Sequence, residues 1–202
     1  MLCPRQCGAD RGHGQIGFCG AGKALRVARA ALHMWEEPPV SGTHGSGTVF
    51  FSHCPLKCVY CQNREISAGG SGLDISETRL VQIFFELRDM GAHNINLVTP
   101  TQYLPSLLPV LKRVKPQLSI PIVYNCGGYE TLEAVDALAP YIDIWLPDLK
   151  YYSSELSARY SAAPDYFEKA SDAIKEMIRL TGGLFWNKKN PAMLDRGVII
   201  RH

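Results

Sequence analysis

The sequence lacks long apolar runs and any large excess of charge. No apolar stretch approaches the roughly 20 residues that a membrane-spanning helix needs. With 21 Lys and Arg against 19 Asp and Glu, the net charge is +2, so charge alone gives no reason to expect nucleic acid or an anionic membrane as a partner. Residues 1–14 also lack the apolar core of a signal peptide. The expected location is therefore the cytoplasm.

The sequence also lacks the paired cysteines of a disulfide-stapled protein. Its seven cysteines are an odd number, and six of them lie in two groups, which contain Cys54, Cys58 and Cys61, and Cys3, Cys7 and Cys19. In a reducing compartment, grouped cysteines more often bind metal or do chemistry than form disulfides. The seventh, Cys126, is expected to be an inert thiol that packs near the functional site.

Apolar runs and amphipathic stretches alternate through most of the chain. Because helices between strands imply right-handed crossovers, this order predicts a parallel sheet, either barrel-like or doubly wound. Periodicity alone does not choose between the two. The expected strands are 48–54, 95–100, 119–125, 141–150 and 197–202, and the expected helices are 76–90, 103–115, 130–139 and 165–180.

Two domains are expected. Residues 1–47 read as a Cys- and Gly-rich extension with one helix over 22–37, where Leu25, Ala28, Leu32 and Trp35 share a helical face. Residues 48–202 read as the α/β core. The chain stops directly after its fifth apolar strand, so we expect this core to be incomplete at its C-terminus.

The stretch HCPLKCVYCQN, residues 53–63, admits three interpretations. Its cysteines at i, i+4 and i+7 can lie on one buried helical face. They can bind zinc with a fourth ligand such as His53, His44 or an N-terminal cysteine. They can also bind an iron–sulfur cluster, in which three thiolates leave one iron open to a reactant. In parallel folds, the loop after a strand is a place where ligands bind.

The same stretch resembles a known signature. Cys54-Pro-Leu-Lys-Cys58-Val-Tyr60-Cys61 is similar to the CxxxCxΦC motif of radical S-adenosylmethionine enzymes, where Φ is aromatic. The resemblance implies a [4Fe–4S] cluster on the three cysteines, with S-adenosylmethionine bound at the open iron and near Tyr60. It implies reductive cleavage of that cofactor to a 5′-deoxyadenosyl radical, which abstracts hydrogen from a substrate.

Further segments resemble an uncharacterised branch related to pyruvate formate-lyase activating enzyme. The fold implied is a partial (β/α)6 TIM-like barrel, of which five units are present here. The implied partners are an electron donor such as flavodoxin or ferredoxin, and either a glycyl radical type enzyme or a small molecule as substrate. The segments are EEPPVSG (36–42), GSGTVFFSHCPLKCVYCQN (45–63), NINLVTPTQY (94–103), IPIVYNCGGYE (120–130) and IDIWLPDLKYY (142–152).

Cofactor-binding residues are predicted at the C-terminal ends of three of the strands. Where the family commonly carries a GGE stretch, this chain has Thr99 and Thr101, whose hydroxyls can accept from an ammonium group. Asn125 can bond a ribose or carboxylate. By resemblance, Asp148 and Lys150 lie near the cofactor and a monovalent cation. The plainer alternatives are a helix cap for the threonines, a turn at Asn125 and a weak surface pair for Asp148 and Lys150.

The sequence leaves alternatives open for the N-terminal cysteines and for the function of the whole chain. Cys3, Cys7 and Cys19 form a Cx3C pair with a distant third cysteine, which can be an auxiliary metal site or ordinary thiols. The alternative function for the whole chain is a non-catalytic zinc or iron–sulfur module for interaction or redox sensing. Such a module would close the fourth coordination position with a side chain.

Overall fold

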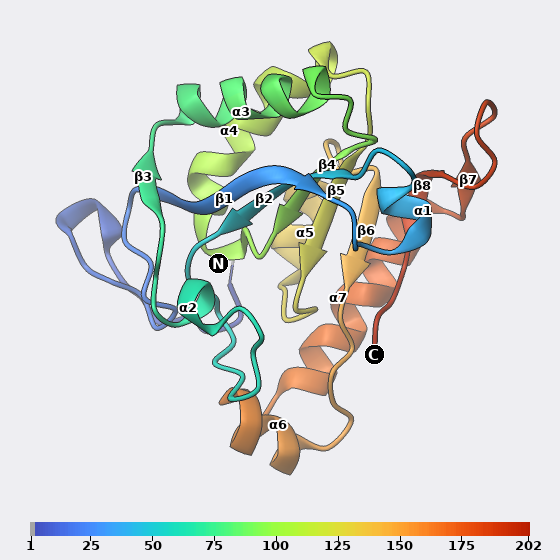
Figure 1. Ribbon diagram of the computed structural model, residues 1–202. Helices are drawn as coiled ribbons and strands as arrows, with labels where there is room; N and C mark the ends of the chain where they lie inside the picture. Colours follow the sequence, from blue (N-terminus) through green and yellow to red (C-terminus); the bar gives the residue numbers. More distant parts are fainter. Residues whose placement is uncertain (1–2) are drawn as a thin grey trace.

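The computed structural model describes residues 3–202 as a single sheet covered by helices (Figure 1). Within these residues the sheet has eight strands in the order β3-β1-β2-β4-β5-β6-β8-β7. The strands are β1 (Leu25–His33), β2 (Ser46–Phe51), β3 (Leu73–Ile75), β4 (Ile95–Val98), β5 (Ile122–Cys126), β6 (Ile144–Pro147), β7 (Phe185–Trp186) and β8 (Leu194–Val198). The helices are α1 (Pro38–Ser41), α2 (Arg64–Ser67), α3 (Glu77–Asp89), α4 (Leu104–Val114), α5 (Leu132–Leu138), α6 (Ser154–Ser161) and α7 (Tyr166–Thr181), with 3-10 turns η1 (Arg11–His13), η2 (Thr101–Tyr103) and η3 (Lys115–Gln117).

The centre of the sheet is parallel. Strands β2, β4, β5, β6 and β8 are neighbours in chain order, and each pairs in parallel with the next. A doubly wound sheet would reverse its strand order at a switch point, and this sheet does not. The predicted parallel α/β fold is confirmed, and the strand order is consistent with a partial barrel.

The two faces of the sheet differ in polarity. Alternate residues such as Leu97, Tyr124 and Trp145 belong to one large apolar core with helices α3, α4, α5 and α7. The other face carries a smaller apolar cluster, which includes Val123, and polar side chains such as Asn125. Since these four helices pack on one face, the opposite face and the strand ends are left for other contacts.

The helix predicted over residues 22–37 is wrong. These residues form β1, which pairs antiparallel with both β2 and β3 at the edge of the sheet. Leu25 and Val27 are buried at strand spacing, whereas Trp35, placed on the predicted helical face, is 88% exposed. Pairing with two neighbouring strands overrides the local helical pattern.

The remaining differences concern boundaries and short elements. Ser76 caps α3, its side chain accepting from the Arg79 N–H. The last strand is β8, which begins and ends earlier than the predicted strand over 197–202, and it is followed by an isolated bridge between Asp148 and Arg201. Helix α6 and strands β3 and β7 were not predicted. No helix within residues 3–202 has the length and apolar character to cross a membrane.

One carboxyl group is buried behind the sheet. Glu130 is 2% exposed and follows β5. The Thr101 hydroxyl donates to its Oε1 at 2.6 Å, and the Tyr124 hydroxyl donates to its Oε2 at 3.4 Å. Burial raises the pKa of Glu130 from 4.5 to about 8, because the charged form loses its hydration. At neutral pH this side chain is therefore mostly protonated.

This raised pKa predicts a pH-dependent stability. As the pH rises from about 4.5 to about 8, the unfolded chain loses the Glu130 proton while the folded chain keeps it, so the free energy of unfolding falls by at most about 1.4 kcal/mol per pH unit. In Glu130→Gln this loss is absent. Urea unfolding at several pH values should show the stability of the variant, relative to wild type, rising across this interval.

The matched control is Glu133→Gln in α5. Glu133 is exposed, and the pKa of its carboxyl is lowered, first by its own backbone N–H, so this variant should show no such rise. A pH-independent difference between Glu130→Gln and wild type would contradict the prediction.

Candidate functional site

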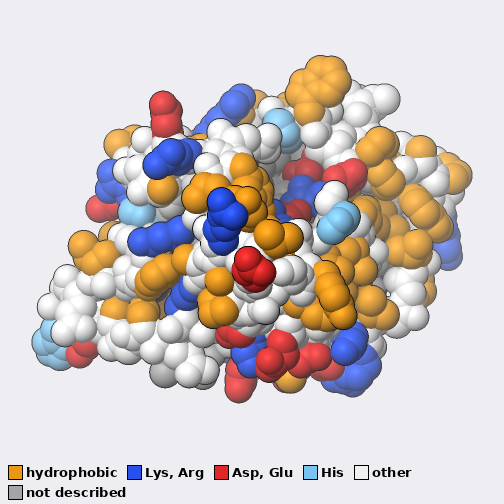
Figure 2. Space-filling model, turned by 90° about the horizontal axis from the view of Figure 1, so that it is seen from below, with side chains coloured by type: hydrophobic (Ala, Val, Ile, Leu, Met, Phe, Trp, Pro, Cys, Tyr) orange, Lys and Arg blue, Asp and Glu red, His pale blue; other side chains and the backbone are white. Residues whose placement is uncertain are grey.

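A cavity of 480 Å³ opens where the parallel strands end, and we call it the site cavity. Figure 2 looks onto this end, where charged side chains of both signs meet in a hollow between hydrophobic ones. A hollow of 560 Å³ lies at the opposite edge, beside Lys115 and Asp143, where such folds rarely do chemistry. Among the predicted site residues, those lining the site cavity are Cys54, Tyr60, Cys58, Cys61, Thr99, Asn125, Asp148 and Lys150.

Thr101 is the predicted site residue that does not line the cavity. It is 3% exposed, and its hydroxyl is bonded to Glu130 in the core behind the sheet. Thr99 does line the cavity and has a φ of 54°, which is unusual for a β-branched residue. His53, just before the first cysteine, has a φ of 69°. These two strained positions lie after β4 and β2, and such strain is typical of functional sites.

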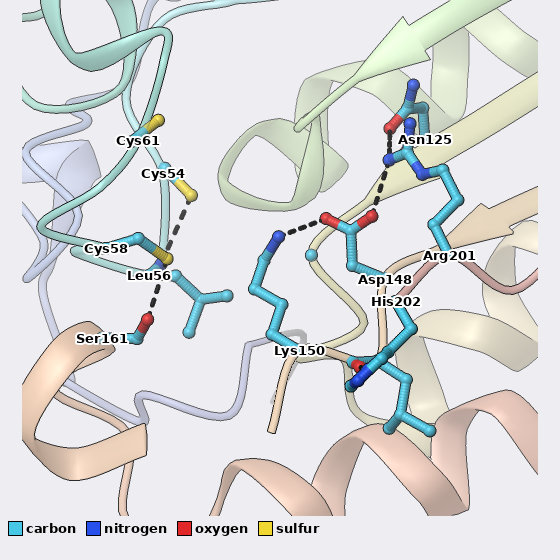
Figure 3. A network of polar contacts seen from close by, with 12 residues as sticks. Cys54, Leu56, Cys58, Cys61, Asn125, Asp148, Lys150, Ser161, Arg201 and His202 are labelled. Atoms are coloured by element: carbon cyan, nitrogen blue, oxygen red, sulfur yellow. Dashed lines mark hydrogen bonds and ion pairs between the residues drawn. The ribbon is translucent and has the colours of Figure 1, made fainter. Parts of the chain in front are cut away.

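The three cysteines lie on the loop over residues 52–63, which we call the cysteine loop. Each sulfur accepts a hydrogen bond: Cys54 from the Leu56 N–H at 3.4 Å, Cys58 from the Ser161 hydroxyl at 2.9 Å and Cys61 from the Ser67 hydroxyl at 3.2 Å. Donors aimed at sulfur stabilise a thiolate, which is the form that binds metal. Ser161 comes from the end of α6, so a helix that was not predicted supports the motif (Figure 3).

The donor set fits an iron–sulfur cluster. Three thiols on one loop are soft ligands of the kind that such clusters take. Burial raises the pKa of the Cys54 thiol to about 12, so binding must displace a proton there. Within residues 3–202, no three His, Cys, Asp or Glu side chains are already close enough together to hold a metal ion. The cysteine side chains must therefore rotate toward one another to bind.

The histidines considered as a fourth zinc ligand lie differently. His44 stacks on His93, with ring centroids 5.1 Å apart, and His93 lines the hollow at the opposite edge of the sheet. His53 adjoins the cysteines and lines the site cavity, and its buried Nδ1 has no hydrogen-bond partner among residues 3–202. Of these two histidines, His53 is the one that lies close to the three cysteines.

The wall facing the cysteine loop is charged. We call it the charged wall, and its members are Glu36, Asn125, Asp148, Lys150 and Arg201. Arg201 donates to Asn125 Oδ1 at 2.7 Å, and it forms ion pairs with Asp148 at 2.9 Å and Glu36 at 3.1 Å. Asn125 Nδ2 donates to Glu36 at 2.9 Å, and Lys150 pairs with Asp148.

The charged wall is balanced and half-buried. Two carboxylates meet two cations, and the exposed fraction of each charged side chain is 27% or less. Burying these charges costs desolvation free energy, and the pairing of every charge with an opposite one offsets that cost. Figure 3 shows Lys150 extending between the charged wall and the three sulfurs, so its ammonium can reach a ligand held between them.

Tyr166 of α7 fixes the strand ends beneath the wall. Its buried hydroxyl lies 2.8 Å from the carbonyl oxygens of both Gly127 and Asp148, and it accepts from the Lys150 N–H at 2.9 Å. Gly128 has a φ of 76°, and a Cβ there would lie 2.1 Å from the Asp148 carbonyl oxygen. Only glycine permits this approach of β5 and β6.

The sequence reasoning missed Glu36 and Arg201 as site residues. Glu36 lies within the segment that was predicted as a helix over 22–37, so nothing placed it beside the strand ends. Arg201 stands at the end of the last predicted strand. Because ligands bind at the C-terminal ends of parallel strands, that position could have identified it as a candidate site residue. Tyr151 was also missed: its hydroxyl is bonded to Tyr60 at 2.5 Å and to Ser161 at 2.8 Å, which links Tyr60 to the Cys58 contact.

Comparison with known proteins places this geometry in a family. Residues 48–185 match the family model of the Radical SAM superfamily. Over 210 residues, the chain is 30% identical to an uncharacterized protein of Methanocaldococcus jannaschii, and the match covers 100% of this chain and 55% of that protein. The chain thus spans about half the length of this relative. With the family model matching well over half of its residues, the chain belongs to the radical SAM superfamily.

Proposed function

We propose that the protein is a radical S-adenosylmethionine enzyme that works in the site cavity, with a [4Fe–4S] cluster on Cys54, Cys58 and Cys61. The observation that carries the proposal is that these three thiols share one cavity with the charged wall. When bound, the cluster and cofactor supply a 5′-deoxyadenosyl radical that can abstract hydrogen from a substrate. The cavity of 480 Å³ has the size of a small-molecule site.

The charged wall has the groups that the amino-acid end of S-adenosylmethionine requires. Lys150 and Arg201 are cations that can pair with its carboxylate, and Asp148 and the Thr99 hydroxyl are acceptors for its ammonium. Because Lys150 and Arg201 are already paired with Asp148, binding exchanges partners instead of uncovering charge. A monovalent cation beside Asp148 stays a prediction, and it would have to displace the Lys150 ammonium from that carboxylate.

The positioning residues act through the strand ends. Tyr166 holds the backbone around Asp148 and Lys150, and Ser161 donates to Cys58. Tyr60 lines the cavity and is linked to the same serine through Tyr151. These contacts orient the two sides of the cavity toward each other without touching the reacting atoms.

The substrate and partners are inferred from resemblance to the activating-enzyme branch. A glycine of a partner enzyme or a small molecule is the proposed hydrogen donor, and flavodoxin or ferredoxin is the proposed electron donor. The division into an extension over 1–47 and a core over 48–202 also stays a prediction, although β1 of that extension pairs with β2 of the core.

The first test of this function is spectroscopic. The protein, reconstituted anaerobically with iron and sulfide and then reduced, should give a [4Fe–4S]⁺ electron paramagnetic resonance signal that changes on adding S-adenosylmethionine. In Cys58→Ala the signal should be lost because only two ligands remain. Cys126→Ala, which removes a thiol outside the cysteine loop, is the matched control and should keep it. A zinc-filled protein with no response to S-adenosylmethionine would instead support a non-catalytic metal module.

The second test concerns the charged wall. Replacing Lys150 by Met removes a charge-assisted contact of about 1.5–3 kcal/mol, so the affinity for S-adenosylmethionine should fall roughly 10- to 100-fold. Isothermal titration of the reconstituted protein measures this change. Lys175→Met on the exposed side of α7 is the control and should bind as wild type does. Equal affinity of Lys150→Met and wild type would remove Lys150 from the proposed site.

A further inference from the structure

The thiols of the N-terminal segment take no part in the proposed function. Cys3, Cys7 and Cys19 lie in a loop that packs behind the cysteine loop, and Cys19 and Cys58 line the same small hollow of 290 Å³. Cys3 and Cys19 are partly or fully buried, whereas Cys7 is exposed. A segment of this kind, rich in glycine and short of apolar side chains, has little core of its own to hold it in one conformation.

Two of the three sulfurs lie around Gly17. A Cβ added to Gly17 would lie 3.4 Å from Cys19 Sγ and 3.5 Å from Cys7 Sγ, so the two sulfurs flank the same glycine. The same Cβ would lie 2.9 Å from Arg11 Nη2, so the space that this glycine leaves open is shared by the guanidinium and the two sulfurs. Cys3 is near enough for the charges of Cys19 and Cys7 to contribute to the raised pKa of its thiol, although burial is the larger cause.

Backbone N–H groups lie near each of these sulfurs. The Ala21 N–H, two positions after Cys19, donates to its sulfur at 3.4 Å. The Leu56 N–H makes the same contact with Cys54 in the cluster motif. The backbone N–H groups of Phe18 and Ala9 lower the pKa of the Cys7 thiol. Burial raises the pKa of the Cys3 thiol to about 11, and the Arg5 N–H partly offsets this effect. Amide dipoles aimed at sulfur stabilise the negative charge of a thiolate ligand, whereas they interact only weakly with a neutral thiol.

The turns that produce these contacts depend on glycine. Cys7 is followed by Gly8 with a φ of 64°, and Cys19 is followed by Gly20 with a φ of 91°. A residue in this left-handed conformation reverses the chain directly after the cysteine, which turns the following N–H groups back toward sulfur. The two turns are thus built alike although they lie twelve residues apart in the sequence.

We propose that Cys3, Cys7 and Cys19 form a second metal site, which binds one thiophilic divalent ion, with Zn²⁺ as the ion that this donor set fits best. Three thiolates on a divalent ion leave a net charge of −1, and Arg11, whose Nη2 donates to Cys19 Sγ at 3.3 Å, offsets it. Zinc takes four ligands in a tetrahedron. The exposed side at Cys7 admits water as the fourth.

Binding requires the three side chains to rotate inward and lose their protons. As for the cysteine loop, the sulfurs are not yet gathered around one point in the part of the chain that the structure describes. The rotation is about single Cα–Cβ bonds, and the backbone turns already bring the sulfurs near one another. Because three protons leave when the ion binds, the affinity should fall at low pH.

The site would support the cysteine loop through Arg5. This residue lies between Cys3 and Cys7 in the sequence, and its Nε donates to the Pro55 carbonyl at 2.6 Å. Its Nη2 donates at 3.1 Å to the carbonyl of Ser161, the residue whose hydroxyl bonds Cys58. The guanidinium also lies 4.2 Å from the Phe18 ring centroid. An ion that fixes Cys3 and Cys7 therefore fixes Arg5 and, through it, the backbone of the cluster motif.

Cobalt binding tests the site separately from the cluster. In the full chain carrying Cys54→Ser, Cys58→Ser and Cys61→Ser, Co²⁺ should bind at roughly one ion per chain and give an intense thiolate-to-cobalt charge-transfer absorption. Adding Cys7→Ser and Cys19→Ser should abolish the absorption. Adding Cys126→Ser instead should leave it unchanged. Absence of the absorption in the first variant, or its survival in the second, would overturn the proposal.

A second measurement tests the proposal if the variant without the three cysteines of the cysteine loop does not fold. The chain with all seven native cysteines is purified and its zinc and iron are quantified by mass spectrometry, beside Cys7→Ser with the cysteine loop intact. Zinc should fall from about one ion per chain to a small fraction, while reconstituted iron and the cluster signal remain. Equal zinc in both proteins, or none in either after growth with zinc, would overturn the second site and leave the cluster proposal untouched.

Discussion

The parallel pairing of β2, β4, β5, β6 and β8 is the constraint on which the rest of the structure depends. Parallel strands in one sheet must end at the same edge, so residues that follow different strands become neighbours without any contact in sequence. The register aligns Phe50, Val98, Asn125 and Leu146 across the sheet. The next residues along each strand lead directly into the cysteine loop, Thr99 and Asp148, which is why these residues face one cavity.

The side chains around that cavity are held by two different kinds of interaction. On the side of the cysteine loop, weak donors from α6 and α2 meet sulfur, and Arg5 anchors the backbone. On the other side, full charges pair with one another, and every carboxylate has a cation. Charges that are already paired can exchange partners with a zwitterionic ligand at little electrostatic cost, whereas bare buried charges would have been strongly destabilising. This property is the one that the proposed binding of a ligand with both an ammonium and a carboxylate requires.

The N-terminal segment has a larger part in this arrangement than its sequence suggests. It supplies β1 to the sheet, Glu36 to the charged wall and Arg5 to the support of the cysteine loop. None of these roles has a local signature. Glu36 reaches Arg201 across 165 positions of sequence, and Arg5 reaches Ser161 across 156. Such pairs form only in the tertiary fold, because no window of neighbouring residues in the sequence contains both partners.

Sequence alone identified the thiol motif of the cysteine loop and the alternation that makes the sheet parallel, because both depend on residues close together: three thiols within eight positions, and apolar strands separated by amphipathic helices. It also predicted that Thr99, Asn125, Asp148 and Lys150 stand at the C-terminal ends of strands, which meet at one edge of a parallel sheet. Tertiary structure decided the rest. It made residues 25–33 a strand by offering two neighbours to pair with, it turned Thr101 to the buried Glu130, and it brought Glu36 and Arg201 into the site. The physical reason is that hydrogen-bond partners and burial come from residues distant in sequence, and these override local propensity wherever the two disagree.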